Sequence, residues 1–257
     1  MAIRVGCGSW TDDDYVGVLY PPKLPKKDRL SLYAQWFERV ELNSSYYALP
    51  KRDVVAGWVA QTPDRFLFDV KLPKAFSERP AEAGGSDLVD ALLAVTRPMA
   101  GAEKLGGFLL TLAPSFGPER HRLAELDALA ERLRPYPLAV ELRHRGWVEG
   151  DALAATLGYF RRRELAWVAL DLPRIEAPAI LPPIDEVTDP RLAYMRVHGR
   201  NPHYAKAKSA EERHTYDYAE AELREIATRA KTLAQAAQDV HVSLNNHAKD
   251  FAPKAAI

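Results

Sequence analysis

Ionisable and amide side chains recur at every second position near the ends of several apolar segments of the chain. Successive side chains of a strand point to opposite faces, so each segment would have one apolar and one polar face. Carboxylate, ammonium, guanidinium and imidazole groups on such a face can bind an anion and transfer protons. The segments are Val40-Glu41-Leu42-Asn43, Phe68-Asp69-Val70-Lys71, Val140-Glu141-Leu142-Arg143, Leu170-Asp171, Met195-Arg196-Val197-His198 and Leu244-Asn245.

Helix-like segments separate these strand-like segments, which indicates parallel strands with helices over the outer face. The polar side chains would then meet on the inner face. Ionisable groups inside a protein are unfavourable unless they are paired or functional. We therefore interpret the convergence as an active or binding site.

The composition narrows the class of protein. The chain has 257 residues without a linker or repeat, so we expect a single domain over residues 1–257. Lys plus Arg equal Asp plus Glu at 35 each, and no overall charge favours nucleic acid or an acidic membrane. The only cysteine, Cys7, excludes an internal disulfide and indicates a reducing compartment. No apolar run reaches the ~18 residues of a membrane span, so we expect a cytoplasmic protein without membrane contact.

Eight strands are expected, and helical periodicity lies between most of them. The expected strands are Arg4–Cys7, Arg39–Asn43, Phe66–Leu72, Gly107–Leu112, Leu138–Leu142, Ala166–Leu170, Ala193–Val197 and Val240–Leu244. Four prolines between Leu172 and Asp189 predict an irregular crossover between strands six and seven, and the last helix should be short or missing. The pattern favours a TIM-type (β/α)8 barrel. An open doubly wound sheet is disfavoured, because Gly6-Cys7-Gly8-Ser9 lacks the third glycine of a dinucleotide turn.

Six ordered motifs link the chain to a known family. They are Gly6-Cys7-Gly8-Ser9-Trp10, Val40-Glu41-Leu42-Asn43-Ser44-Ser45-Tyr46-Tyr47 with Pro50, Phe68-Asp69-Val70-Lys71, Val140-Glu141-Leu142-Arg143-His144 with Trp147, Arg196-Val197-His198-Gly199-Arg200 and Asn245-Asn246-His247. In this order they resemble the YecE-like family, domain of unknown function family 72, over nearly the whole chain. The resemblance implies a TIM-barrel-like fold and supplies no reaction.

The chain departs from the family pattern in two places. Family members commonly carry a glutamine in strand four before a Pro-Pro pair, whereas this chain has Leu110-Thr111-Leu112-Ala113-Pro114. The family usually continues through a helix after the Asn-Asn motif, whereas this sequence stops at Ile257. We therefore expect a less completely closed barrel or a less well covered last strand.

Glu41, Glu141 and His198 are the candidate catalytic groups, because carboxylates and an imidazole can take up and return protons. For Glu41 the alternative is an ion pair with a nearby arginine. For Glu141, with Arg143 on the same face, the alternative is an internal Arg–Glu network that holds the barrel together. Both alternatives remain open at this point.

Seven further residues are candidate substrate ligands, and most of them carry a positive charge or an amide. They are Asn43, Lys71, Arg143, Asp171, Arg196, Arg200 and Asn245. The planar fork of Arg143 suits a phosphate or carboxylate. Lys71 should remain an ammonium group that binds an anion and not form a Schiff base, because carboxylates lie nearby and Asp69 would neutralise it from below. Asp171 could instead cap the Pro-rich crossover.

No cofactor follows from the sequence. Glu41, Glu141, Asp171 and His198 are ligand types that suit Mg²⁺ or Mn²⁺, so a divalent metal stays open. The inward cations Lys71, Arg143 and Arg196 oppose a metal unless an anionic substrate bridges them, and we predict no metal ligands. No phosphate-binding Walker motif is present.

The leading hypothesis is an enzyme of hydrolase, isomerase or lyase type that performs acid–base chemistry on a small phosphorylated or carboxylated compound. The first alternative is a nucleic-acid-binding or phosphodiester-processing barrel, in which Trp10, Tyr46 and Trp147 would stack on bases. The second alternative is a non-catalytic sensor of a small ligand. The sequence does not decide whether the protein is an enzyme, nor its oligomeric state.

Overall fold

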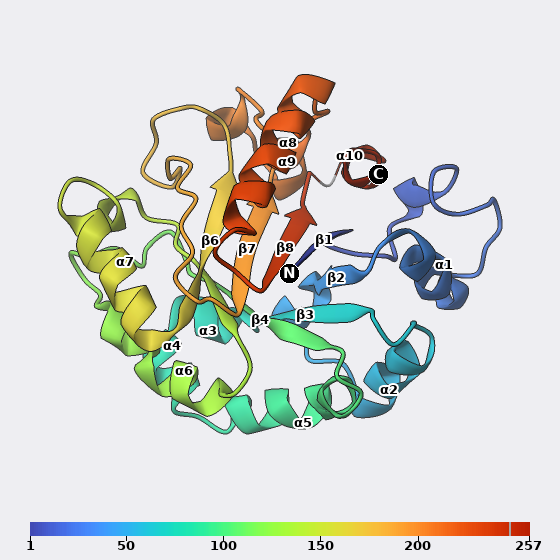
Figure 1. The fold of residues 1–257 in the computed structure, drawn as a ribbon, viewed down its shortest axis with the longest axis horizontal. Helices are drawn as coiled ribbons and strands as arrows, with labels where there is room; N and C mark the ends of the chain where they lie inside the picture. The colour runs from blue at the N-terminus through green and yellow to red at the C-terminus, as the bar shows by residue number, and fades with distance from the viewer. Residues whose placement is uncertain (247) are drawn as a thin grey trace.

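Eight parallel strands form a nearly closed barrel with helices around it (Figure 1). The structure, a computed structural model, describes residues 1–246 and 248–257; His247 of the Asn-Asn-His motif lies outside the described residues. The neighbours in the sheet run in the order β1-β8-β7-β6-β5-β4-β3-β2. The strands are β1 (Ala2–Cys7), β2 (Arg39–Leu42), β3 (Leu67–Lys71), β4 (Leu105–Thr111), β5 (Leu138–Glu141), β6 (Leu165–Asp171), β7 (Leu192–Val197) and β8 (Asp239–Leu244). The predicted TIM-type (β/α)8 barrel is confirmed.

Helices connect most of the strands. The α-helices are α1 (Arg29–Trp36), α2 (Arg52–Ala60), α3 (Lys74–Glu78), α4 (Pro80–Gly84), α5 (Leu88–Gly101), α6 (Asp127–Leu133), α7 (Ala152–Arg163), α8 (Ala210–His214), α9 (Glu220–Leu233) and α10 (Phe251–Ala256). Short 3-10 helices are η1 (Asp13–Tyr15), η2 (Lys26–Asp28), η3 (Asn43–Tyr46), η4 (Leu123–Leu126), η5 (Arg145–Trp147) and η6 (Tyr204–Lys206). Residues 172–191 form the predicted irregular crossover, and the final helix is short. None of the described helices is long and apolar enough to cross a membrane.

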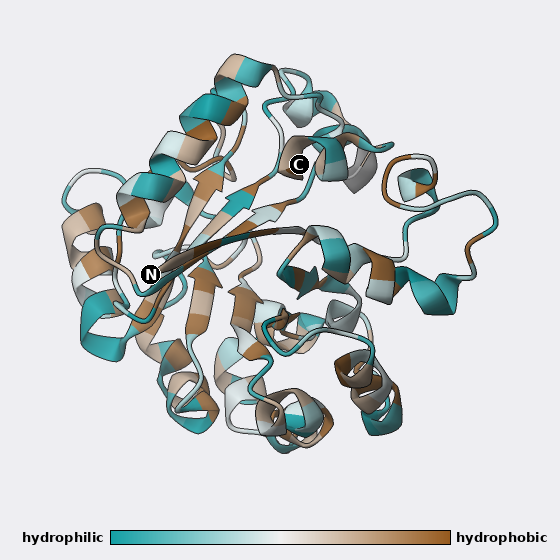
Figure 2. Ribbon diagram, turned by 45° about the vertical axis from the view of Figure 1, so that its right-hand side comes forward, coloured by the Kyte–Doolittle hydropathy of each residue, from teal (hydrophilic) through white to brown (hydrophobic). Residues whose placement is uncertain are grey.

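The outer face of the barrel is apolar because every second strand residue packs against the helices. Val40, Val70 and Val197 are buried there, and Ile226 and Leu233 belong to the buried stripe of α9. In Figure 2 the strands are largely brown, whereas teal residues recur along the surrounding helices. Burial of these apolar faces stabilises the barrel from outside.

The inner face of the barrel is polar, which is unusual because branched aliphatic side chains fill most such barrels. Residues in register on neighbouring strands point to the same face. Glu41 is in register with Asp69, Thr111 with Glu141, and Arg196 with Ser243. The register therefore gathers side chains from distant parts of the sequence in the interior.

The barrel is open at one seam, between its first two strands. Within the described residues, β1 and β2 share no ladder of backbone hydrogen bonds. The hydroxyl of Tyr33, on α1, accepts a hydrogen bond from the Cys7 N–H at 2.6 Å and donates one to the Arg39 carbonyl at 3.1 Å. The two strands are close here, because a Cβ added to Gly6 would lie 2.2 Å from the Arg39 carbonyl oxygen. One side-chain hydroxyl thus takes the place of a ladder bond.

Replacement of Tyr33 by phenylalanine should destabilise the barrel at this seam. The variant leaves the buried Cys7 N–H and Arg39 carbonyl without their partner, which should lower the free energy of unfolding by about 1–3 kcal/mol. Urea denaturation followed by circular dichroism measures the change. The control is Tyr136→Phe, which removes a hydroxyl without a hydrogen bond in the described part of the chain. Equal stability of the two variants would contradict the bridging role.

Candidate functional site

A cavity of about 750 Å³ opens at the carboxyl ends of the strands, where TIM-barrel sites lie. Six of the sequence-predicted site residues line it, from four different strands or strand ends. They are Glu41, Asn43, Lys71, Arg143, Arg196 and His198. The predicted convergence of distant polar residues is therefore present in the structure.

The deepest polar layer lies below the cavity and centres on Arg39, which is fully buried. Its Nε donates to Asp69 at 2.7 Å and its Nη1 to the Val242 carbonyl at 2.8 Å. Nδ1 of His241 lies 3.0 Å from the same aspartate. The expectation that Asp69 neutralises Lys71 is wrong, because the Asp69 carboxylate pairs with Arg39 and His241 in this layer.

Arg39, Tyr194 and His241 do not appear among the residues that the sequence singles out, although a signal for them exists. Each stands two positions before a polar inner residue of its own strand, namely Glu41, Arg196 or Ser243. The polar alternation therefore continues deeper into the barrel than the strand ends suggest.

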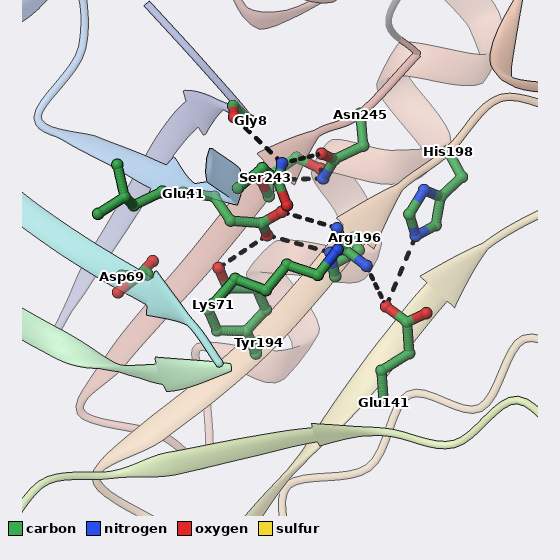
Figure 3. Close-up of polar contacts among 12 residues, drawn as sticks. Gly8, Glu41, Asp69, Lys71, Glu141, Tyr194, Arg196, His198, Ser243 and Asn245 are labelled. Carbon is green, nitrogen blue, oxygen red and sulfur yellow. Dashed lines mark hydrogen bonds and ion pairs between the residues drawn. The ribbon is translucent and has the colours of Figure 1, made fainter. Parts of the chain in front are cut away.

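Arg196 lies in the next layer, between two buried carboxylates (Figure 3). Its Nε and Nη2 donate to Glu41 at 3.0 and 2.7 Å in a bidentate fork. Its Nη1 donates to Oε2 of Glu141. The Tyr194 hydroxyl accepts from Arg39 at 2.8 Å and donates to Glu41 at 3.0 Å, so it joins the two layers. The internal Arg–Glu network left open by the sequence is the observed arrangement.

These contacts keep both glutamates ionised. Burial favours the neutral acid, but the charge and hydrogen bonds of Arg196 outweigh it and hold the pKa of Glu41 far below its usual value. Against the same effect of burial, Arg143 and Arg196 hold the pKa of Glu141 well below its usual value. A carboxylate with such a pKa is a weak base near neutral pH. The geometry therefore favours a positioning role for both glutamates.

Lys71 and Arg143 are the cations at the mouth. Arg143 donates through Nε to Glu141 at 2.5 Å, and its Nη groups make no hydrogen bond with the described residues. Lys71 makes no hydrogen bond or ion pair within the described chain, and its Nζ lies 4.6 Å from the centre of the Tyr46 ring. Burial, and then the charge of Arg196, lowers the pKa of Lys71 to about 7. The nearby carboxylates thus do not hold it as a permanent ammonium.

His198 lines the cavity beside these cations and is only 4% exposed. Neither ring nitrogen has a hydrogen-bond partner among the described residues, and Nε2 lies 3.7 Å from Oε2 of Glu141. Burial, together with the charge of Arg196, lowers its pKa below the usual value. The imidazole is therefore neutral at pH 7, with one nitrogen able to donate and the other able to accept.

Two asparagines connect the strand ends near the seam. Asn43 donates through Nδ2 to the Gly8 carbonyl at 3.1 Å and to Asn245 at 3.3 Å. Asn245 is fully buried and donates to the Ser243 hydroxyl at 3.0 Å. The Oδ1 of Asn43 is buried without a hydrogen-bond partner within the described residues, at the wall of the cavity. Asn43 can therefore contact a ligand, whereas Asn245 positions it.

Asp171 and Arg200 do not line this cavity, contrary to the site that the sequence predicts. Asp171 is in register with Val197 on the outer face, whereas Leu170 is in register with Arg196. Asp171 accepts hydrogen bonds from Arg200 at 2.7 Å, Arg229 at 2.8 Å and Tyr218 at 2.6 Å. The Asp171 carboxylate therefore connects β6 to the segment around α9. The prediction that it faces the cavity is wrong, because its side chain lies on the outer face of the barrel.

The cavity is also lined by aromatic and acidic side chains. Trp10 and Trp58 pack edge to face at 5.1 Å, and Tyr46 and Tyr47 do so at 5.3 Å. The rim beside them carries Asp12, Asp13 and Asp14. Trp147, expected near bases, is instead buried against Phe116, to whose carbonyl its indole donates at 2.6 Å.

A metal site does not form from the candidate ligands. The described residues contain no group of three His, Cys, Asp or Glu side chains placed to hold a metal ion. Arg196 binds both Glu41 and Glu141, and Asp171 faces away.

A family model described as "Protein of unknown function DUF72" matches residues 4–257. The chain belongs to this family. UPF0759 protein YunF of Bacillus subtilis (strain 168) is 28% identical over 255 residues, 95% of this chain and 89% of YunF. UPF0759 protein YecE of Escherichia coli (strain K12) is 38% identical over 129 residues, 47% of this chain and 45% of YecE. The crystal structure of a DUF72 family protein from Thermotoga maritima matches with a TM-score of 0.87 at 29% identity, over 100% of this chain and 96% of that one.

The predicted resemblance to the YecE-like DUF72 family is thus confirmed. The family description states no reaction, so the chemistry of the cavity has to be inferred from its own residues. On β4, in the segment where the sequence departs from the expected family pattern, this chain lines the cavity with Thr111.

Replacement of Arg196 by methionine should destabilise the protein strongly and in a pH-dependent way. The variant removes the guanidinium that two buried carboxylates share, which should cost about 3–5 kcal/mol. Both glutamates have lowered pKa values in the folded state, so their pairing stabilises the fold fully above the unfolded pKa and is lost only as the pH falls through the folded pKa. In the variant, the unpaired carboxylates can take up protons in acid, which reduces the cost of burying them. The loss in the variant should therefore be largest at pH 7 and shrink toward pH 4.

Denaturant titrations at pH 4 and pH 7 measure this difference between wild type and variant. Arg224→Met, which removes an exposed ion pair with Glu220 on α9, is the matched control and should change stability by less than about 0.5 kcal/mol. A loss that is the same at both pH values would contradict the pairing of ionised glutamates.

Proposed function

We propose that this cavity binds a small phosphorylated or carboxylated compound and that the protein is an enzyme transferring protons on it. The observation that carries the proposal is the group of side chains at the mouth. The Nη atoms of Arg143 and the amine of Lys71 make no hydrogen bond with the described residues, and the buried ring nitrogens of His198 have no hydrogen-bond partner among them. Polar groups without a protein partner at a cavity wall favour a polar ligand.

The charges of the site favour an anion near Arg143 and Lys71. The charges of the site cancel among Glu41, Glu141, Arg143 and Arg196. Protonation of Lys71 therefore gives the site a net positive charge. An anion would compensate that charge. Asp12 and Asp14, which also line the cavity, would repel an anion beside them, whereas Asp13 pairs with Lys26 and Arg29. The anionic end of a ligand would therefore lie beside Arg143 and Lys71, with its remaining atoms against the aromatic side chains of the cavity.

The geometry changes the proposed roles of several residues. Arg143 binds the anion, because a guanidinium group stays charged near neutral pH and offers a free fork. His198 transfers protons, because its neutral ring has a donor and an acceptor. Glu41, Glu141 and Arg196 position these groups. Hydrolase, isomerase and lyase chemistry all remain compatible with this arrangement.

The two alternatives differ from the proposal in measurable ways. A nucleic-acid-binding barrel should bind generic DNA or RNA with a steep salt dependence, which the acidic rim and the zero formal charge oppose. A sensor should bind the anion without turning it over. A cytoplasmic location stays a prediction, consistent with the one cysteine, which is buried.

Sulfate binding should weaken as the pH rises from 6 to 8. Lys71, with a pKa of about 7, is protonated at pH 6 and mostly neutral at pH 8, so affinity should fall by about tenfold. Sulfate keeps its own charge over this range. Isothermal titration calorimetry measures the affinity in wild type, Lys71→Met and Lys71→Arg.

The Lys71→Met variant should bind weakly at both pH values, Lys71→Arg should bind at both, and Arg143→Gln should lose affinity throughout. Lys74→Met is the matched control, because Lys74 is an exposed lysine paired with Glu78. A Lys71→Met variant with the wild-type pH dependence would contradict the anion site.

The pKa of the His198 imidazole should rise when sulfate binds in the cavity. The pKa of its imidazole is lowered in the free protein, and a sulfate beside it should favour the protonated ring and raise that pKa. Nitrogen-detected NMR titration of the histidines measures this, with His198→Gln identifying the signal. The exposed His203 is the control. A His198 titration that sulfate leaves unchanged would argue against its place in the site.

A further inference from the structure

Lys71, which is half-buried at the cavity wall, differs from the buried Lys104. Lys104 is 4% exposed, and its ammonium donates to the Val59 carbonyl at 2.9 Å and to the Thr62 carbonyl at 2.7 Å. Lys71 has no such acceptor among the described residues, although it projects from the end of β3 into the cavity. Lys104 thus has acceptors for its ammonium protons, whereas the amine of Lys71 contacts the face of Tyr46.

The surroundings of Lys71 hold the amine in place without hydrogen bonding it. Figure 3 shows its side chain extending toward Arg196, and its Nζ lies over the face of Tyr46. The carboxylates of Glu41 and Glu141 are occupied by arginines. The charged or titratable groups around the amine are Glu41, Tyr46, Glu141, Arg143, Arg196 and His198.

We propose that the Lys71 amine is a nucleophile that forms an imine with a small anionic carbonyl compound, a 2-oxo acid or a phosphorylated aldehyde or ketone. This inference rests on the proposed function, because Arg143 would hold the anionic group while the carbonyl carbon meets Nζ. It narrows the substrate class from anions in general to anions that carry a carbonyl group.

The step needs no oxidant or reductant. The Nζ lone pair attacks the carbonyl carbon, and the C=O electron pair moves to oxygen, which takes a proton. The carbinolamine then loses its hydroxyl and the remaining Nζ proton as water while the C=N bond forms. Amine and carbonyl thus give imine and water. His198 is the cavity group suited to exchange the proton with the departing hydroxyl.

The free amine required for this step is available near neutral pH. Burial and the adjacent guanidinium of Arg196 lower the pKa of Lys71 to about 7. At pH 7.5 this lysine therefore exists mainly as the nucleophilic form, whereas an ordinary lysine is almost entirely ammonium. The face of Tyr46 keeps the amine over the cavity.

Reductive trapping tests the inference on the intact protein. The protein is incubated at pH 7.5 with pyruvate or glycolaldehyde phosphate and sodium cyanoborohydride, which reduces an imine to a stable secondary amine. Intact mass and peptide mapping locate the adduct. A single adduct on Lys71, formed about tenfold or more faster than on Lys74, is the expected result. Lys71→Arg and Lys71→Met should lose it, and circular dichroism checks that both variants fold.

Two control variants test whether trapping depends on the anionic group of the carbonyl compound and on the cavity. Arg143→Gln should slow trapping of pyruvate but not of acetone, which lacks the anionic group. Lys74→Met should trap like wild type. Labelling spread evenly over surface lysines, or Lys71 reacting no faster than Lys74, would overturn the inference.

Calorimetry with pyruvate in the absence of reductant separates the two proposals. Binding without an adduct on Lys71 would overturn the imine and leave the anion site standing. Neither binding nor an adduct would overturn both.

Discussion

Arg196 lies between Glu41 and Glu141 inside the barrel, and the other polar contacts of the interior are arranged around it. Two buried carboxylates would strongly oppose folding without a cation, and one guanidinium can serve both because its donors point in different directions. Through Tyr194 the same network reaches Arg39 and the deepest layer. The buried arginines and carboxylates of the interior thus form one connected network of ion pairs and hydrogen bonds.

The pairing of Arg196 with the two glutamates determines which side chains are left to contact a ligand. Because the glutamates are neutralised internally, they do not hold Lys71 in its ammonium form, and burial beside Arg196 lowers its pKa. His198 stays neutral for a related reason, since it is buried beside the same arginine. The arginine therefore stabilises the carboxylates and activates two nitrogen groups above them.

The sequence predicts the inner face well wherever alternation alone decides it. Glu41, Arg143 and His198 reach the cavity because strand parity and the parallel arrangement fix their direction. The prediction for Asp171 is wrong, because the alternation within one strand does not show which of its two faces is the inner one. The register of Asp171 with Val197 places it on the outer face. Partners are harder still: the Asp69–Arg39 pair and the low pKa of Lys71 depend on distances between strands that no single segment encodes.

The paired interior also bears on affinity. A site whose carboxylates and arginine already hold each other does not need to rearrange when a ligand binds, so little binding free energy is lost to ordering. Among the described residues, Lys71, Asn43 and His198 are left with unused hydrogen-bonding capacity at the cavity. Lys104 shows that this chain can satisfy a buried lysine fully with backbone oxygens. Lys71 at the mouth has no such acceptor among the described residues, so its amine is left to contact a ligand in the cavity.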